Sequence, residues 1–208
     1  MIRILDYGAG NLKSVCNALR YIGCEAEITD NPQVLMESGA AILPGVGAFG
    51  DAAASLRNSG LWQPALDYIA SGRPFLGICL GMQLLFEESE ETPGVRGLGV
   101  FPGKIGRIPD GEDLKIPHMG WNSLDIKMPD GLFSGVPQQS YVYFVHSYYL
   151  HSPQRDIVSS CTTYGVQIDA SVQSGNVFGT QFHPEKSGTA GLQMLRNFAK
   201  MEKEYQNK

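Results

Sequence analysis

A short apolar segment that runs into a Gly-X-Cys-X-Gly turn constrains this chain more than any other feature. Residues 73–83 read Arg-Pro-Phe-Leu-Gly-Ile-Cys-Leu-Gly-Met-Gln. This pattern predicts a strand, a sharp bend at Cys79 and a helix that begins directly after the bend, which is the cysteine version of a nucleophile elbow. Gly77 and Gly81 flank the bend, where a Cβ atom would clash with the neighbouring strand or helix. The sequence therefore predicts that Cys79 lies at the carboxyl end of a strand.

This setting makes Cys79 a candidate nucleophile. The first N–H groups of a helix have no partner within the helix, and a helix N-terminus carries partial positive charge. Both effects favour the thiolate, which is the reactive form of cysteine. An isolated cysteine is more often a small, inert, buried residue. The assignment therefore depends on the two glycines and on partner residues elsewhere in the chain.

The N-terminal part of the chain alternates between strand and helix patterns. This alternation predicts an α/β fold with a central, mostly parallel sheet covered by helices on both faces. The elbow helix is expected to continue to about Glu88. The expected strands are 2–7, 25–29, 40–43 and 75–78, and the expected helices are 12–22, 34–37, 51–58 and 61–70.

After about Gly94 the pattern changes to short alternating runs separated by Gly and Pro, which predict a smaller mixed or antiparallel sheet. The chain closes with an amphipathic helix over 187–205, whose polar end, 200–208, is expected to be a solvated tail. We find no interdomain linker or repeat, so residues 1–208 are predicted to form a single domain. The expected strands are 104–108, 123–126, 141–149, 157–163, 166–172 and 177–181, and the inward helical residues are Leu192, Leu195, Phe198 and Ala199.

Composition excludes several classes of function. The net charge of −5 and the scattered basic residues argue against a nucleic-acid surface. No run of 18 apolar residues is present and the N-terminus lacks a signal-peptide pattern, so we expect a cytoplasmic protein without a membrane partner. The four cysteines show no zinc or disulfide spacing, and Gly8-Ala-Gly-Asn lacks the third glycine of a dinucleotide motif. We therefore expect no metal and no cofactor.

A thiol nucleophile needs a base, and the base needs an orienting group. His183 lies in Thr-Gln-Phe-His-Pro-Glu-Lys-Ser, and Pro184 biases it toward an extended conformation. In an extended segment His183 and Glu185 point to the same side, so the carboxylate can meet one imidazole nitrogen and leave the other for the thiol. Taken alone, His183 is as often a surface or capping residue. Together with the elbow, the motif predicts a Cys79-His183-Glu185 triad.

A site for the oxyanion is the third part of the predicted centre. Pro44-Gly-Val-Gly follows a predicted parallel strand close to where the elbow should emerge. Glycines beside Val46 allow its backbone N–H to turn toward a developing negative charge, and the N–H of Leu80 is the expected second donor. Considered alone, the segment is more often an ordinary glycine-rich loop.

These three motifs together resemble the class I, or triad, glutamine amidotransferases, in which they occur in the same order. Further motifs narrow the resemblance to the glutaminase subunits of imidazole glycerol phosphate synthases, from histidine biosynthesis. The resemblance extends from Ile2 to about Lys200, without a departure at the triad. The motifs are DYGAGN at 6–11, PGVGAFGD at 44–51, HMGWN at 118–122, YFVHSY at 143–148 and QFHPEKS at 181–187.

The resemblance implies a flavodoxin-like amidotransferase fold and a glutaminase. Cys79 would attack the side-chain amide of glutamine, His183 would move the protons and Glu185 would fix the imidazole tautomer. Ammonia would pass to a cyclase, which is a (β/α)₈ barrel and forms a heterodimer with this chain. That partner would make imidazole glycerol phosphate and aminoimidazole carboxamide ribotide.

The same resemblance implies roles for further residues in glutamine binding and in the partner interface. Each has a simpler alternative: segment 141–149 is an ordinary aromatic strand, Lys186 is a solvent-exposed lysine and Trp121 is a buried side chain without a contact role. We also hypothesise that the Pro44–Gly47 segment rests with the Val46 N–H turned away until the partner binds its nucleotide. The glutamine-binding residues implied are Gly45, Gly47, Gln83, His146, Ser147 and Tyr148, and the implied interface residues are Asn11, Trp121, Asn122, Tyr143 and Lys186.

Three alternatives remain at this stage. The first is a glutaminase subunit that serves pyridoxal, anthranilate or guanylate synthesis. The second is a stand-alone cysteine hydrolase of γ-glutamyl compounds, and the third is a catalytically silent docking subunit. The motifs at 118–122 and 186–187 argue against the first, and the apparent partner-facing residues argue against the second. The complete triad argues against the third.

Overall fold

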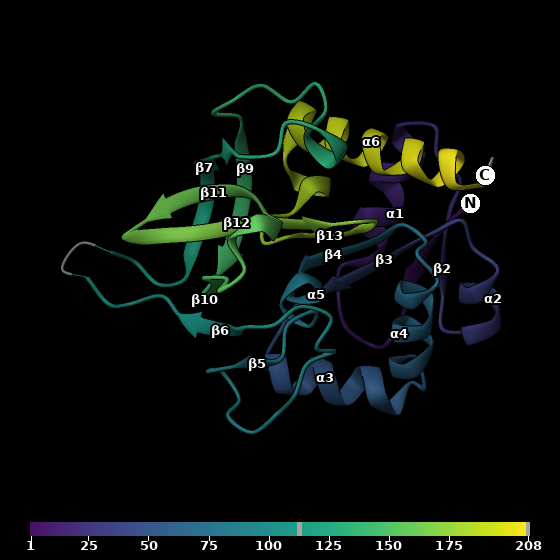
Figure 1. Cartoon of the computed structure of the whole chain (residues 1–208), viewed down its shortest axis with the longest axis horizontal. Helices are drawn as coiled ribbons and strands as arrows, with labels where there is room; N and C mark the ends of the chain where they lie inside the picture. Colours follow the sequence, from purple (N-terminus) through teal and green to yellow (C-terminus); the bar gives the residue numbers. More distant parts are fainter. Residues whose placement is uncertain (112–113, 207–208) are drawn as a thin grey trace.

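The computed structural model describes residues 1–111 and 114–206. In this part of the chain, eight strands form one twisted sheet in the order β2-β1-β3-β4-β13-β12-β11-β8 (Figure 1). The first five of these strands pair in parallel and the last three in antiparallel fashion. Their bounds are β1 (Ile2–Leu5), β2 (Ala26–Thr29), β3 (Ala40–Gly45), β4 (Phe75–Cys79), β8 (Asp125–Ile126), β11 (Val158–Tyr164), β12 (Val166–Ser174) and β13 (Val177–Thr180).

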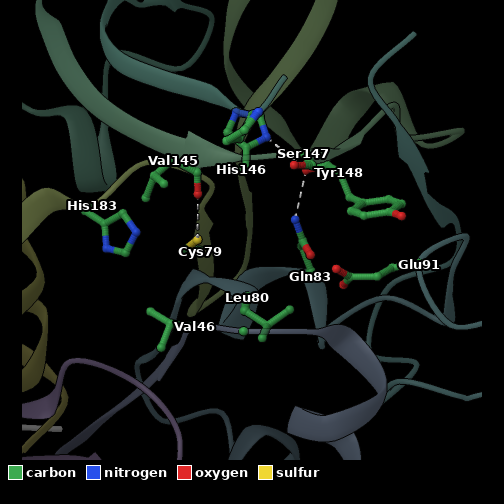
Figure 2. Close-up of a pocket in the computed structure, with 12 residues that line it drawn as sticks. Val46, Cys79, Leu80, Gln83, Glu91, Val145, His146, Ser147, Tyr148 and His183 are labelled. Carbon is green, nitrogen blue, oxygen red and sulfur yellow. Dashed lines mark hydrogen bonds between the residues drawn. The ribbon is translucent and has the colours of Figure 1, made fainter. Parts of the chain in front are cut away.

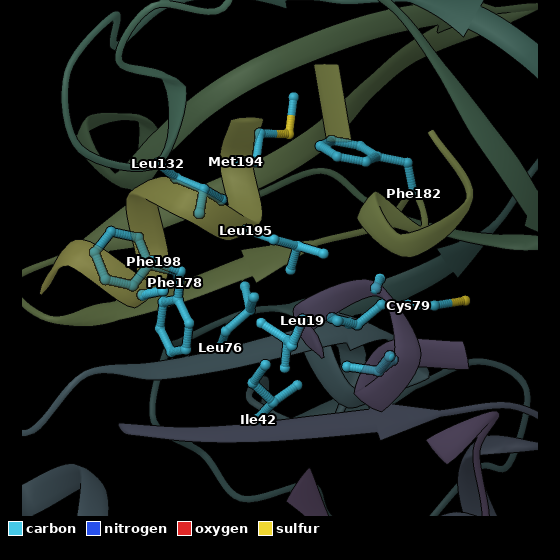
Figure 3. Close-up of a cluster of buried hydrophobic side chains, with 14 of the residues drawn as sticks. Leu19, Ile42, Leu76, Cys79, Leu132, Phe178, Phe182, Met194, Leu195 and Phe198 are labelled. Atoms are coloured by element: carbon cyan, nitrogen blue, oxygen red, sulfur yellow. The ribbon is translucent and has the colours of Figure 1, made fainter. Parts of the chain in front are cut away.

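Helices cover both faces of the parallel part of the sheet, as the sequence predicts (Figure 1). Successive residues of a strand point to opposite faces, so Ile42 packs in one hydrophobic core and Leu43 in the other. The first core holds α1 and α6 (Figure 3), and the second holds α3 and α4. The helices are α1 (Leu12–Tyr21), α2 (Pro32–Met36), α3 (Phe49–Asn58), α4 (Trp62–Ala70), α5 (Leu80–Gln83) and α6 (Gly188–Gln206).

Two smaller sheets and three 3₁₀ turns complete the described residues. One sheet has the order β10-β6-β5, and the other is the antiparallel pair β7-β9. The fold class predicted from the sequence is therefore confirmed, although four of the C-terminal strands, β8, β11, β12 and β13, extend the main sheet instead of joining a smaller one. The remaining bounds are β5 (Glu88–Ser89), β6 (Lys104–Arg107), β7 (His118–Ser123), β9 (Tyr141–His146), β10 (Tyr148–Leu150), η1 (Gly131–Phe133), η2 (Arg155–Ile157) and η3 (Pro184–Lys186).

The predicted elbow helix is much shorter than expected, because α5 ends at Gln83 instead of near Glu88. The segment 97–103 takes the backbone groups that a longer helix would use. Leu98 N–H donates to the carbonyl of Leu84 at 2.7 Å, and Gly97 N–H donates to that of Glu87 at 2.8 Å. A Cβ atom at position 97 would lie 2.1 Å from the Phe86 carbonyl oxygen, so this approach requires glycine.

Two strand predictions are corrected in the same region. The expected strand over 141–149 breaks at Ser147 into β9, which pairs with β7, and β10, which pairs with β6. The strand expected over 123–126 is divided between the end of β7 and β8. In both cases the two parts belong to different sheets, so the chain leaves one sheet and enters another at the break.

The predicted solvated tail is wrong at Glu202. Helix α6 continues to Gln206, and Glu202 is only 5% exposed. Its Oε1 accepts a hydrogen bond from the N-terminal amine of Met1 at 2.6 Å, so the tail packs against the start of β1. Residues 207–208 of the expected tail lie outside the described residues. No helix within the described ranges is long and apolar enough to cross a lipid bilayer.

Candidate active site

Three parallel strands end at one place and bring their following residues together. Gly45 at the end of β3 lies opposite Cys79 at the end of β4, and Thr180 at the end of β13 lies opposite Ile78. Carboxyl ends of neighbouring parallel strands form the usual ligand crevice of an open α/β sheet. The elbow, the Pro44–Gly47 segment and the His183 segment therefore meet at this edge.

The backbone at Cys79 has the bend predicted from the sequence. Its φ is 55° and its ψ is −110°, a conformation that side-chain-bearing residues rarely adopt. A Cβ atom on Gly81 would lie 1.8 Å from the Leu43 carbonyl oxygen, and one on Gly77 would lie 2.7 Å from the Gly81 carbonyl oxygen. Both glycines are thus required by the close approach of α5 to the sheet, which holds Cys79 in its strained turn.

His183 and Glu185 are in contact, although not by the predicted route. The Nδ1 of His183 lies 2.8 Å from Glu185 Oε1, and both side chains are buried. His183 is extended as expected, but Glu185 lies within the turn η3 that begins at Pro184. The turn, rather than an extended segment, returns the carboxylate to the imidazole.

The environment of His183 favours its protonated form. Burial lowers the pKa of the imidazole, but the neighbouring Cys79 sulfur and the Glu185 carboxylate outweigh it and raise the pKa to about 9. The buried Nε2 of His183 has no hydrogen-bond partner within residues 1–111 and 114–206. Figure 2 shows the His183 ring beside the Cys79 sulfur. The arrangement suits an imidazolium that exchanges a proton with the thiol.

The sulfur of Cys79 is held between two further groups. The thiol lies 3.9 Å from the Val145 carbonyl oxygen, and the Gln181 Nε2 donates to the sulfur at 3.7 Å. The neighbouring Gln83 donates from its Nε2 to Gln181 Oε1 at 2.9 Å and to the Tyr148 carbonyl at 3.0 Å. Gln181 is thus fixed by the elbow helix and in turn contacts the nucleophile.

A cavity of about 350 Å³ opens beside the triad. It has room for a small amino acid. Figure 2 shows Glu91 and His183 on opposite sides of it. Ten of its lining residues belong to motifs that the sequence analysis identifies, and the other two are Glu91 and Pro117. The lining residues are Val46, Gly47, Cys79, Leu80, Gln83, Glu91, Pro117, Val145, His146, Ser147, Tyr148 and His183.

No sequence pattern marks Glu91 as a site residue, because it lies in an acidic run that is typical of a solvated surface. In the structure it accepts a hydrogen bond from the Phe49 N–H at 2.7 Å, at the N-terminus of α3. The unpaired N–H groups and the dipole of a helix N-terminus stabilise a carboxylate there. The loop 84–103 carries Glu91 to this point. Among the lining residues it is the one acidic side chain.

Most of the predicted glutamine-binding residues line the cavity, with two qualifications. Gly45 does not line it; a Cβ atom there would lie 2.8 Å from both the Gly81 nitrogen and the Leu80 Cβ, so this glycine permits close packing. The His146 ring points away from Cys79, and both of its nitrogens have internal partners (Figure 2). His146 contributes backbone to the wall of the cavity and cannot donate from its ring to a ligand.

Tyr7 anchors the predicted oxyanion segment, Pro44–Gly47, through a hydrogen bond. The buried Tyr7 hydroxyl donates to the Pro44 carbonyl at 2.8 Å, and burial, with the nearby Cys79, raises the pKa of the phenol. Beyond this anchor, Val46 is 45% exposed and Gly47 adopts a positive φ of 98°. The segment is therefore fixed at Pro44, and Val46 is free of the core.

Three of the predicted interface residues, Trp121, Tyr143 and Lys186, lie together beside Val145 of the cavity wall. Residues 119, 121, 143 and 145 share one face of the β7-β9 pair, because Trp121 lies opposite Tyr143 and Met119 opposite Val145. Met119 is 62% exposed and Trp121 is 55% exposed. The Lys186 ammonium lies 5.8 Å from the centre of the Tyr143 ring.

Asn122 and Asn11 have local roles as well. Asn122 points to the other face of β7, where it donates to the Thr163 carbonyl at 2.9 Å. Asn11 caps α1 by accepting a hydrogen bond from Ser14 N–H at 3.4 Å. The side chain of Asn122 thus faces away from the exposed aromatic face.

Comparison with known proteins identifies the family. The family model described as "Glutamine amidotransferase class-I" matches residues 3–201. The chain belongs to this family.

Among individual relatives of this amidotransferase, the protein named "Imidazole glycerol phosphate synthase subunit HisH" from Methanothermobacter thermautotrophicus is 53% identical. That alignment covers 97% of this chain and 98% of the relative. Proteins of the same name from Desulfitobacterium hafniense and Syntrophotalea carbinolica are 52% and 48% identical. They cover 96% and 97% of this chain, and the alignments span 94% and 100% of those proteins.

Solved structures share the fold of this amidotransferase at low identity. A putative GMP synthase component from Thermoplasma acidophilum matches with a TM-score of 0.73 and 19% identity, covering 99% of this chain and 95% of that one. The structure titled "Structure of PurLQS from Thermotoga maritima" matches with a TM-score of 0.69 and 20% identity, covering 95% of this chain and 96% of that one. At these identities the likeness supports the fold alone.

Proposed function

We propose that this chain is the glutaminase subunit of an imidazole glycerol phosphate synthase. The observation that carries the proposal is the Cys79-His183-Glu185 arrangement beside a cavity, in a chain about half identical to proteins of that name over nearly its full length. The enzyme hydrolyses glutamine to glutamate and ammonia and supplies the ammonia to a second subunit.

The reaction begins with the Cys79 thiolate and the His183 imidazolium. The sulfur attacks the side-chain amide carbon of glutamine, an S–C bond forms, and the carbonyl electrons move to oxygen. His183 then gives its proton to the amide nitrogen, the C–N bond breaks and ammonia leaves. Glu185 holds Nδ1, so His183 acts through Nε2 throughout.

The second half of the reaction releases glutamate. Neutral His183 takes a proton from water as the water oxygen attacks the thioester carbon. The S–C bond breaks, and Cys79 returns as the thiolate beside the imidazolium. The backbone N–H groups of Val46 and Leu80 are the proposed donors to the oxyanion in both halves.

The cavity also offers groups for the amino-acid end of glutamine. Glu91 supplies a carboxylate for the α-ammonium, and the amide oxygen of Gln83 remains as an acceptor because its nitrogen is already used twice. The backbone of Ser147 and Tyr148, with Gly47 opposite, is the proposed site for the α-carboxylate. Binding both ends fixes the amide carbon at the Cys79 sulfur, as a reaction of this kind requires.

The partner in this proposal is a cyclase subunit with a (β/α)₈ barrel, bound as a heterodimer over the mouth of the site. The exposed Met119 and Trp121, the adjoining Tyr143 and the cation of Lys186 support an interface at this place. Asn11 and Asn122 are further proposed contacts. A closed interface would keep ammonia unprotonated and away from water. Nucleotide binding on the partner is proposed to turn the Val46 N–H toward the oxyanion.

We also infer that residues 1–208 act as a single domain in the cytoplasm. The main sheet joins strands from both halves of the chain, which supports one domain. All four cysteines are free thiols, and Cys79 must stay reduced to react, which supports a reducing compartment.

Glutamate release from glutamine tests the proposal, first with this chain alone and then in the presence of the cyclase with its nucleotide substrate. Cys79→Ala should abolish glutamate release, whereas Cys24→Ala, which removes a partly exposed thiol outside the site, should leave it unchanged. Stimulation by this cyclase, and not by the synthases of pyridoxal, anthranilate or guanylate formation, is expected. Hydrolysis that persists in Cys79→Ala would overturn the proposal, and a full rate without any partner would overturn the gating.

A further inference from the structure

Two buried histidines form a direct pair behind the wall of the cavity. His118 on β7 lies opposite His146 on β9, and His118 Nδ1 is 2.9 Å from His146 Nε2. The His118 ring is stacked between Phe144 and Tyr164, with ring centres 4.7 Å and 4.0 Å away. The pair is therefore held rigidly on the inner face of the strands whose outer face lines the mouth of the site.

The hydrogen bonds of this pair define where each proton lies. His146 Nδ1 is 2.9 Å from the Tyr148 carbonyl oxygen, which can only accept, so this nitrogen carries a proton. At the other end, Asn122 Nδ2 lies 3.4 Å from His118 Nε2 and donates to the Thr163 carbonyl, so His118 Nε2 is the acceptor. The one neutral arrangement that satisfies both ends has the proton on Nδ1 of each ring.

Burial keeps both rings neutral. It lowers the pKa of His118 to about 4. It also lowers that of His146 to about 3, with smaller effects of His118 and His183 in the same direction and an opposing effect of the bond to the Tyr148 carbonyl. A proton added to His146 Nε2 would face the His118 N–H, so protonation would break the pair.

This pair is connected to the nucleophile. The Tyr148 carbonyl accepts from both His146 Nδ1 and Gln83 Nε2, which clamps the break between β9 and β10. Gln83 then donates to Gln181, whose amide contacts the Cys79 sulfur at 3.7 Å. A continuous series of hydrogen bonds therefore runs from Asn122, beside the exposed Trp121, to the sulfur.

We propose that His118 is a positioning residue for glutamine binding: through His146 it holds the Tyr148 carbonyl, and with it the Ser147–Tyr148 backbone and Gln83, in the geometry that binds the amino-acid end of the substrate. This inference rests on the proposed glutaminase function. It assigns to His118 and His146 a role in orienting the cavity wall without contact with substrate. Without the His118 proton donor, the segment must be ordered by glutamine itself, which weakens binding.

The first test measures glutamine binding by calorimetry in Cys79→Ala protein, which cannot turn over its ligand. His118→Phe keeps the stacked ring and removes the donor, and we expect its glutamine Kd to rise roughly 5- to 30-fold. His118→Asn places an amide N–H near the former Nδ1 and should recover binding to within about threefold of the parent. The control is His151→Phe, the same change at an exposed histidine, which should leave the Kd unchanged.

The outcomes separate this inference from the proposed function. A folded His118→Phe variant that binds glutamine within about twofold of its parent overturns the positioning role. A Cys79→Ala parent that binds no glutamine at all overturns the proposed function, and the positioning role with it.

The second test does not need a variant of the pair or any activity. The ¹⁵N shifts of the imidazole rings distinguish Nδ1–H, Nε2–H and imidazolium forms, and both His118 and His146 should show the neutral Nδ1–H form at pH 7. An Nε2–H or charged form at either residue would overturn the inference even if glutamine hydrolysis proceeds as proposed.

Discussion

Substitution of Gly81 by alanine tests the close packing that holds the elbow. A Cβ atom at this position would lie 1.8 Å from the Leu43 carbonyl oxygen, and real Cβ contacts are essentially never below 3.0 Å. The difference, 3.0 − 1.8 = 1.2 Å, is the least distance by which α5 and β3 must separate. Both partners are backbone, so no side-chain rotation can relieve the clash.

The expected sign follows from two opposing contributions to the free energy of unfolding. Alanine favours a helix over glycine by about 1 kcal/mol. Overpacking of this kind costs about 1–3 kcal/mol or more, and α5 has only four residues in which to gain from propensity. The backbone overlap of 1.2 Å places the cost at the upper end of this range, so after the gain in propensity we expect Gly81→Ala to lower the free energy of unfolding by roughly 2 kcal/mol. Each kcal/mol corresponds to about 2–4 °C in Tm.

The effect on catalysis should be larger than the effect on stability. The shift moves the Cys79 sulfur and the Leu80 N–H relative to His183, and a misplacement of about 1 Å can lower kcat about 100-fold. Urea unfolding and glutamate release by folded protein in the complex with the cyclase measure the two effects. Gly106→Ala is the matched control, because its Cβ would meet nothing closer than 3.7 Å.

One result would refute this reasoning. If Gly81→Ala unfolds at the same or higher urea concentration than the parent, with kcat within about threefold, the close approach of α5 to Leu43 does not hold the elbow. The same conclusion would follow if Gly106→Ala were equally damaging.

Two further predictions concern the triad and the oxyanion segment. The raised pKa of His183 means that its contribution to stability is present below the ordinary value near 6.5 and is lost as pH rises through about 9. Glu185→Gln should shift the alkaline limb of kcat to lower pH and cost more stability at pH 6 than at pH 10; a limb unmoved in Glu185→Gln contradicts the assignment. Tyr7→Phe removes the donor to the Pro44 carbonyl, so we expect a loss of about 1–2 kcal/mol in urea unfolding and a lower kcat with KM nearly unchanged; a changed KM with normal kcat would place Tyr7 elsewhere in the mechanism.

Local patterns accounted for much of the fold. The strands β3 and β4 are short apolar runs buried on both faces, and β1 is apolar and buried except at Arg3. Their alternation with helices predicts a parallel sheet. The glycines around Cys79 signalled the bend, because only glycine tolerates the backbone contacts found there. The contact between His183 and Glu185 was also predictable, since the two residues are close in sequence.

Other features depended on partners far away in the chain. The helix after Cys79 ends at Gln83 because segment 97–103 takes the carbonyls of residues 84–87, and no signal within the helix itself marks that end. Glu202 is buried because the N-terminal amine lies beside it, across 201 positions of sequence. The local sequence predicts a longer helix after Cys79 and a solvated tail at 200–208, and neither prediction is correct.

The sequence by itself determined the chemistry of this protein, and the tertiary structure decided its setting. Nucleophile, base and orienting carboxylate are carried by short motifs whose local geometry is encoded by glycine and proline. The cavity wall is not encoded in this way: Glu91 faces the site because it binds the N-terminus of α3, and His118 meets His146 across a strand pair. A contact between residues distant in sequence follows from the packing of whole elements, which no local pattern specifies.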